Sequence, residues 1–353
     1  MPAMSSRARY AVLALLVAAA AAAILAATLP RHAATARGPA AASQPTTQPR
    51  QSPEDLAAAC KQAADGLRGR LDRSFNFVVS PPFVVAGNCS PRQLDEYLKW
   101  SVVRPAEAMW KSYFDKKPVA VITILLFGDG DSYRRWAKEL FGDTNVAHFG
   151  YCRRDGVMVM DISTGTGTLV HELTHALIKY DFPDVPDWFN EGLGSLHEQC
   201  NVGERSITGL VNWRLAGLQQ AIDKGELRSL KQLVTADDFY GRLRGLNYAH
   251  ARYFVMYMQH RGVLEKFYKT LRDGYAERGE IPARRGGVGR RNAAPPSSNR
   301  QSSTRAAQRS AASQSSITNR QSMAVSAVET SLGLPIDEID KSMRKWVMTL
   351  KFR

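Results

Sequence analysis

Two histidines and a glutamate lie close together in the middle of the chain, in the segment His171-Glu172-Leu173-Thr174-His175. In a helix, His171 and His175 are one turn apart and project from the same face. Two imidazoles at that spacing can hold one zinc ion, and Glu172 beside them can accept a proton. This H-E-x-x-H pattern predicts a catalytic metal site on a helix over residues 168–180.

A catalytic zinc site usually has three protein ligands and an open position for water. We expect the third ligand on a second helix over residues 186–198, where Pro186 suits the first helical position. Glu191 lies on this helix, 16 residues after His175, and a helix–turn–helix of that length can bring it to the histidine pair. The alternative is a core helix with hydrogen-bonded histidines, but two histidines and a glutamate are costly to bury without a ligand.

The sequence HELTHAL followed by PDWFNEGLGSLHE resembles the gluzincin metallopeptidases, in particular the peptidase-MA-like proteins with a W-x-N/x-E-G-L/A pattern in the second helix. The resemblance implies one Zn²⁺ per chain, held by His171, His175 and Glu191. It also implies that Glu172 is the general base. Ser195 departs from the pattern of thermolysin-like enzymes, which place there an aspartate that orients a ligand histidine, so the partner of that histidine stays open.

The resemblance covers residues 75–274 approximately and resumes near Met323. It implies an α+β, zincin-like fold, in which a small mixed β-sheet subdomain precedes a mainly helical subdomain. The zinc site would lie on two helices between them.

A tyrosine on a helix after the third ligand stabilises the oxyanion in several gluzincins. By this resemblance Tyr248 is the first candidate and Tyr253 the second, and for either one taken alone a packed core tyrosine is the favoured alternative. His197 is expected to face away from Glu191, since six residues at 100° each turn it by 240°. Glu198 is either close to the ligand or a solvated carboxylate.

The segments before the motif alternate between strand and helix patterns. Val119–Phe127 is a continuous β-branched and apolar run, which predicts a strand covered on both faces. Val157–Asp161 is a candidate edge strand on which an extended peptide could add, with an interior strand as the equal alternative. Other expected strands are 75–79, 83–86 and 148–152, and expected helices are 54–73, 91–115 and 132–141.

The segments after the motif read as helical. Residues 205–275 are expected to form helices, with a strong one over 246–267 that ends or bends near Arg261-Gly262. A last helix is expected within 326–350. The glycines at 165 and 167 are interpreted as a flexible connection, since no Lys-Ser/Thr follows them as in a P-loop.

The N-terminus carries an uninterrupted apolar run over residues 10–29 after two arginines. Residues 1–30 are therefore a signal sequence or a membrane anchor, and residues 31–53 a flexible linker. Either reading predicts an exported protein, membrane-anchored by this helix, or periplasmic or secreted if the segment is cleaved.

The net charge of +14 is concentrated outside the expected domain. Residues 1–53 hold five arginines and no acid, and residues 281–324 hold eight arginines and no acid or lysine. The remainder is nearly neutral, which argues against specific nucleic-acid binding. We interpret 54–280 as the catalytic domain, 281–324 as a disordered basic insertion, and 325–353 as a C-terminal helix completing the domain.

The four cysteines, Cys60, Cys89, Cys152 and Cys200, form no C-x-x-C pair. In an exported domain they could form two disulfides with three possible pairings, and free thiols are an equal alternative.

These observations predict a zinc-dependent peptidase that hydrolyses peptide bonds with a zinc-activated water and Glu172 as general base; its partner would be a polypeptide substrate. The alternative from another class is a non-catalytic, metal-binding zincin-fold module that binds or senses a ligand outside the cytoplasm. A third possibility is hydrolysis of a non-peptide amide or ester.

Overall fold

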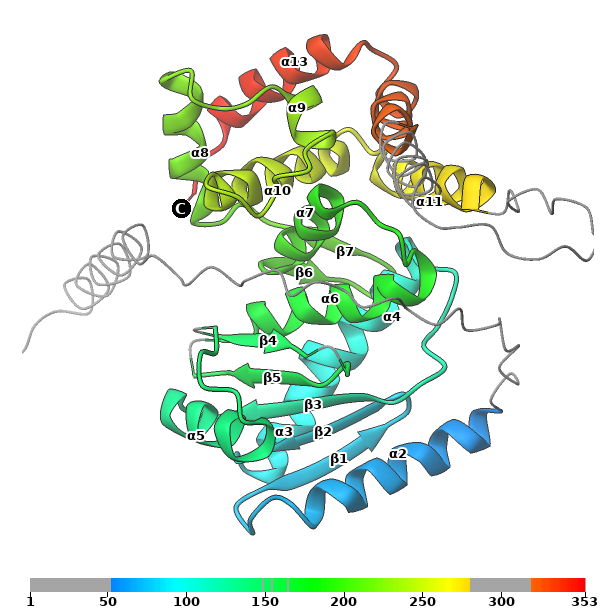
Figure 1. Ribbon diagram of the computed structural model, residues 1–353, viewed down its shortest axis with the longest axis vertical. Coiled ribbons are helices and arrows are strands. Elements are labelled where there is room, and N and C mark those ends of the chain that lie inside the picture. The colour runs from blue at the N-terminus through cyan, green and yellow to red at the C-terminus, as the bar shows by residue number, and fades with distance from the viewer. Residues whose placement is uncertain (1–51, 148, 154, 164, 280–318, 353) are drawn as a thin grey trace, which may run out of the picture. The chain divides into compact units, whose positions relative to one another are not determined.

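The computed structural model describes residues 52–147, 149–153, 155–163, 165–279 and 319–352. It is an α+β protein with one five-stranded mixed sheet followed by a largely helical part (Figure 1). The strands are β1 (Asn76–Ser80), β2 (Phe83–Gly87), β3 (Ile122–Phe127), β4 (Gly150–Cys152) and β5 (Met158–Asp161). The α+β class is therefore as predicted.

The strand order is β1-β2-β3-β5-β4. Strands β2, β3 and β5 are parallel, with Ile124 opposite Met158, whereas β1 and β4 are antiparallel to their neighbours. The edge strand on this side is β4, so the prediction of an edge strand at Val157–Asp161 is wrong. All four residues of β5 are buried, as is typical of a strand covered on both faces.

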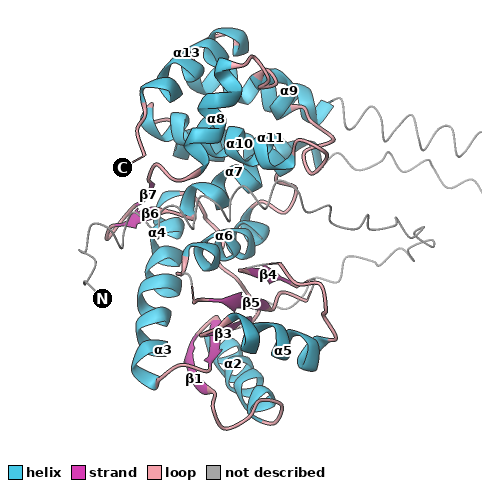
Figure 2. Cartoon of the chain, turned by 90° about the vertical axis from the view of Figure 1, so that its left-hand side faces the viewer, coloured by secondary structure: helices cyan, strands magenta, loops and turns pink. Residues whose placement is uncertain are grey.

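Successive residues of the sheet face two different apolar clusters, as the alternation of side chains along a strand requires. Leu125 and Phe127 pack under α2 (Pro53–Arg68) and α5 (Gly130–Phe141). Ile124 and Leu126 face the other cluster. That face is covered by α3 (Pro91–Tyr97), the π-helix η1 (Leu98–Val103) and α4 (Arg104–Ser112), on the opposite side from α5 (Figure 2).

The helices α6 (Gly167–Asp181) and α7 (Asp187–His197) follow the sheet, and α6 lies between the sheet and α7 in both views (Figures 1 and 2). The remaining elements are the hairpin β6 (Cys200–Val202) and β7 (Ile207–Gly209), helices α8 (Arg214–Asp223), α9 (Leu230–Val234), α10 (Arg244–His260) and α11 (Leu264–Gly279), the helix over 319–332, and α13 (Ile336–Thr349). Helix α10 packs along α7.

Two expected boundaries need correction. The predicted all-helical stretch 205–275 contains strand β7, whose Ile207 is buried. Residues 319–324, expected at the end of the basic insertion, are helical, because Ala324 and Val328 pack into the core. The rest of the insertion lies outside the described residues.

The predicted leader and linker also lie outside the described residues, apart from Ser52, which caps α2, and Pro53, its first residue. Among the described residues, no helix combines the length and apolar character needed to cross a bilayer. All four cysteines are described, and each is a free thiol in the structure.

Candidate metal site

Helix α6 presents the two motif histidines from one side of a buried helix. Leu173 and Leu177 are fully buried on the core side of the helix. His171 is 8% exposed and His175 is partly buried. The predicted helix and the placement of both histidines on one face are confirmed.

Both ends of α6 are fixed by close contacts. At the first residue, a Cβ on Gly167 would lie 2.4 Å from the Glu198 carbonyl oxygen, so the glycine permits close packing and is not a flexible connection. At the last residue, Asp181 accepts hydrogen bonds from the Asp115 backbone and the Tyr268 hydroxyl, at 3.0 and 2.7 Å. These contacts leave α6 little freedom to move relative to α7 and α11.

Helix α7 brings Glu191 into the same buried space. The helix begins at Asp187, with Pro186 at the cap, one residue later than the sequence predicted. Glu191 is only 7% exposed, because α7 is packed between α6 and α10. The predicted approach of Glu191 to the histidine pair is confirmed.

The three side chains converge on one point. The Nε2 atoms of His171 and His175 are 2.9 Å apart, and the Glu191 Oε2 atom is 3.4 Å from the first and 3.3 Å from the second. One ligand atom from each residue lies within 4.8 Å of the others, so this group could hold a metal ion. Two imidazoles and a carboxylate are a donor set that zinc and other divalent transition metals accept.

The electrostatics of the cluster also favour a cation. Burial by itself raises the pKa of the Glu191 carboxyl, but hydrogen bonds to His171 and His175 outweigh it and hold the pKa far below its usual range. The pKa of His175 is raised, because its bonding and attraction to Glu191 exceed the opposite effect of burial. A buried carboxylate that stays ionised among two imidazoles is suited to binding positive charge.

Two of the three side chains are also held by hydrogen bonds at the atom that does not face the cluster. The Nδ1 atom of His175 is 2.9 Å from Asn190 Oδ1, and the Tyr240 hydroxyl donates to Glu191 Oε1 at 2.7 Å. The Glu191 Oε2 atom is buried and faces the Nε2 atoms of both histidines, at 3.4 and 3.3 Å. Asn190 therefore orients His175, and Tyr240 directs Oε2 toward the histidines. The Nδ1 atom of His171 is buried without a hydrogen-bond partner among the described residues, so no residue replaces the aspartate expected at Ser195 for that ring.

Gly194 lies directly under the two rings. A Cβ at this position would be 2.9 Å from Cε1 of His175 and 3.3 Å from Cε1 of His171. The absence of a side chain at Gly194 thus makes room for both imidazoles. Together with the buried Oε2 atom that faces both imidazole nitrogens, this space shows that the residues present fit a bound metal ion.

Glu172 is partly buried on α6 and makes no hydrogen bond or ion pair within the described part of the chain. Burial raises the pKa of the Cys152 thiol to about 11, and the negative charge of Glu172 adds to this shift. Helix α6 itself packs against the edge strand β4. The Glu172 carboxylate follows the first histidine of the cluster directly in the sequence and is not held by a partner among the described residues.

The structure separates the tyrosine candidates. The Tyr248 ring lies 6.5 Å from the ring of Tyr240, and the pKa of Tyr248 is raised first by burial and then by the charge of Glu191. Tyr253 is instead fully buried, with its hydroxyl bonded at 3.1 Å to both the backbone N–H and the carbonyl of Asn212. Tyr253 therefore has a structural role, whereas the catalytic role of Tyr248 stays a prediction.

Sequence reasoning missed Tyr240, the tyrosine in direct contact with the cluster. It lies in the loop between α9 and α10, outside any periodic pattern. In the sequence, Tyr240 is preceded by the acidic pair Asp237-Asp238 and by Phe239. Neither the acidic pair nor the neighbouring phenylalanine indicates that this tyrosine contacts Glu191.

His197 and Glu198 lie at the C-terminal end of α7 and have polar partners outside the cluster. His197 is fully buried, with Nδ1 3.1 Å from the hydroxyl of Thr174 on α6. Glu198 forms an ion pair of 3.2 Å with Arg214. It is therefore neither a solvated carboxylate nor a partner of Glu191.

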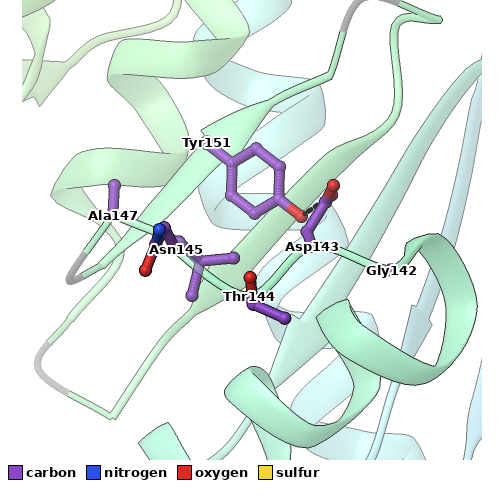
Figure 3. A pocket seen from close by; sticks show the side chains of 7 residues that line it. Gly142, Asp143, Thr144, Asn145, Ala147 and Tyr151 are labelled. Atoms are coloured by element: carbon purple, nitrogen blue, oxygen red, sulfur yellow. Dashed lines mark hydrogen bonds between the residues drawn. The ribbon is translucent and has the colours of Figure 1, made fainter. Parts of the chain in front are cut away.

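A separate hollow of about 420 Å³ lies beside the loop after α5. It is lined by residues 142–147 and Tyr151, and the Tyr151 hydroxyl is bonded to Asp143 (Figure 3). Arg153 also pairs with Asp143, at 2.6 Å. Because its one carboxylate is already neutralised and no residue of the histidine–glutamate cluster lines it, this hollow is not the metal site.

Comparison of the sequence with models of known protein families and with curated proteins gives no match.

Proposed function

We propose that the protein is a zinc-dependent peptidase of the gluzincin type, with His171, His175 and Glu191 as the metal ligands. The observation that carries this proposal is the convergence of two Nε2 atoms and one carboxylate oxygen in a buried space, with an unpaired Glu172 next to the first ligand. Zinc is favoured over other divalent metals because two imidazoles and one carboxylate are the ligand set of many catalytic zinc sites.

The chain's own residues have distinct roles in this proposal. A zinc ion at the cluster would supply Lewis-acid chemistry, which lowers the pKa of water and polarises a carbonyl. Glu172 accepts the proton of the attacking water and passes it to the leaving amine. The phenol of Tyr248 donates a hydrogen bond to the oxygen that becomes negative, while Tyr240 and Asn190 hold Glu191 and His175 in place.

A polypeptide substrate is favoured by the open edge of the sheet. Strand β4 pairs with β5 alone among the described strands, and it lies against α6, the helix that carries Glu172. An extended peptide added to β4 would form main-chain hydrogen bonds that do not depend on its sequence. This proposal includes export by the N-terminal segment, with or without cleavage.

The second candidate function is a non-catalytic metal-binding module that binds or senses a ligand outside the cytoplasm. The observation that favours it is the fixed position of α6, because a rigid site is also suited to recognition without turnover. The unpaired Glu172 favours catalysis instead.

The test is the Glu172→Gln variant, which keeps the shape of the side chain and removes the base. We expect hydrolysis of an unfolded protein to fall by more than about a hundredfold, the usual contribution of general acid–base catalysis. Bound zinc should stay at the level of the parent. Glu139→Gln, at an exposed position on α5, is the matched control and should leave hydrolysis unchanged. Full activity of Glu172→Gln would exclude Glu172 as the base, and no hydrolysis by the zinc-loaded parent would favour the binding module.

A further inference from the structure

An arginine at the start of α10 lies against the tyrosines of the metal site. The Arg244 guanidinium carbon is 6.0 Å from the ring centroid of Tyr240 and 5.6 Å from that of Tyr248. The Tyr240 hydroxyl in turn bonds Glu191. We call the three residues Tyr240, Arg244 and Tyr248 the tyrosine–arginine wall.

The wall is open to solvent. Tyr240 is 47% exposed and Arg244 is exposed, while Tyr248 is partly buried. An arginine has five N–H donors, so one that contacts two tyrosines keeps further donors available to a carboxylate. A molecule bound at the cluster can therefore reach Arg244.

Arg244 has no acidic partner in the described part of the chain, which is also true of Arg242 but not of several other arginines of the helical part. Arg214 is paired with Glu198 at 3.2 Å, Arg228 with Asp238 at 2.9 Å, and Arg344 with Asp340 at 2.8 Å. The first turn of α10 also contains no acid and no side-chain cap.

One further carboxylate, that of Asp187, lies on α7 one helical turn before Glu191 and therefore on the same face of that helix. Asp187 forms no ion pair with Arg244, or with any other cation, within the described residues.

We propose that Arg244 is a specificity-determining residue that recognises a carboxylate of the substrate next to the bond being cleaved. This inference rests on the proposed peptidase function and adds a substrate class: peptides with an acidic side chain near the scissile bond, or peptides bound by their C-terminal carboxylate. A charge-assisted, bidentate bond from arginine is the strong form of carboxylate recognition.

The test measures binding, so that it does not depend on turnover. The full chain carrying Glu172→Gln is loaded with zinc, and peptide binding is measured by isothermal titration calorimetry. The peptides form a series in which one glutamate is moved through each position of an extended peptide. For every peptide of the series, a neutral twin carries glutamine in place of that glutamate. A second pair differs only in a free or an amidated C-terminus. The first arm reports recognition of a side chain, and the second reports recognition of a chain end.

We expect one glutamate position, or the free C-terminus, to bind about tenfold more tightly than its neutral twin, as one charge-assisted bond provides. Adding Arg244→Gln should abolish this preference while zinc content and melting temperature stay unchanged. Arg242→Gln is the matched control, because it removes an equal charge from an exposed residue that makes no ring contact; it should keep the preference.

Equal binding of charged and neutral twins would overturn the proposal, as would loss of the preference in Arg242→Gln. The two proposals fail separately. Hydrolysis by the parent without any charge preference removes the role of Arg244 alone. Charge-selective binding by a parent that hydrolyses no peptide removes the peptidase function alone.

Discussion

Two pairs of buried histidines in this molecule have opposite properties. His171 and His175 share a space with the carboxylate of Glu191, and the pKa of His175 is raised. His197 and His250 are fully buried, and no acidic residue of the described chain is their partner. Burial, followed by the charges of nearby arginines, lowers the pKa of each to about 3.

The difference shows that burial alone does not make a histidine a metal ligand. Neither ring nitrogen of His250 has a hydrogen-bond partner among the described residues, yet no carboxylate converges on it. At the candidate metal site a carboxylate, a free position under the rings and a fixed orientation of the His175 ring occur together. Each of these three features can be removed separately.

The largest effect is expected from filling the space under the rings. In Gly194→Ala the new Cβ would lie 2.9 Å from the His175 ring, so both imidazoles must shift. We expect zinc affinity, measured by competition with a chelating dye, to fall by about a hundredfold or more, the upper range for changes next to ligands. Gly217→Ala is the control, because nothing lies within 4 Å of its added Cβ; it should keep zinc affinity. Unchanged affinity in Gly194→Ala would contradict the ring positions.

A smaller effect is expected from releasing the orientation of one ring. In Asn190→Ala the Nδ1 atom of His175 loses its partner at 2.9 Å. Loss of such a partner costs about ten- to a hundredfold in metal affinity. The same titration measures it, with the exposed Asn201→Ala as control. Equal affinities for the two variants would mean that the Asn190 contact does not orient the ligand.

A third effect concerns the histidines outside the cluster and appears in stability rather than in metal affinity. His250 has a folded pKa of about 3 against an ordinary value of 6.5, so between these values the unfolded chain binds a proton that the folded chain does not. The contribution of neutral His250 to the free energy of unfolding is therefore complete above pH 6.5. It decreases as the pH drops toward 3, by at most about 1.4 kcal/mol per pH unit.

His250→Leu removes this titrating group. Between pH 6 and 4, the free energy of unfolding of the variant should therefore change less steeply with pH than that of the parent, by up to about 1.4 kcal/mol per pH unit. Urea unfolding at each pH measures it. An unchanged slope in a folded His250→Leu variant would show that His250 is not neutral in the folded state.

Much of the metal site could be predicted from the sequence because its central part is local. Helical geometry fixes His171 and His175 on one face, and the distance of Glu191 along the chain suits a helix–turn–helix. The apolar residues around the motif indicated that α6 would be buried. The α+β class followed from strand patterns that precede helical ones.

The missed features depend on contacts between distant segments. Tyr240 reaches Glu191 across 49 positions, from a loop without periodicity. The edge strand was misassigned because β5 crosses over to pair with β3, and local patterns do not determine strand order. Gly167 was taken for a flexible position because its close contact with Glu198 arises only when α6 and α7 pack.

The most direct test of the metal site is the zinc content of the purified full chain by elemental mass spectrometry, beside the His175→Ala and His250→Ala variants. We predict about one zinc per chain in the parent and in folded His250→Ala, and little in His175→Ala. No zinc in a folded parent after dialysis against zinc, or equal zinc in the parent and His175→Ala, would contradict the assignment of this cluster as a metal site.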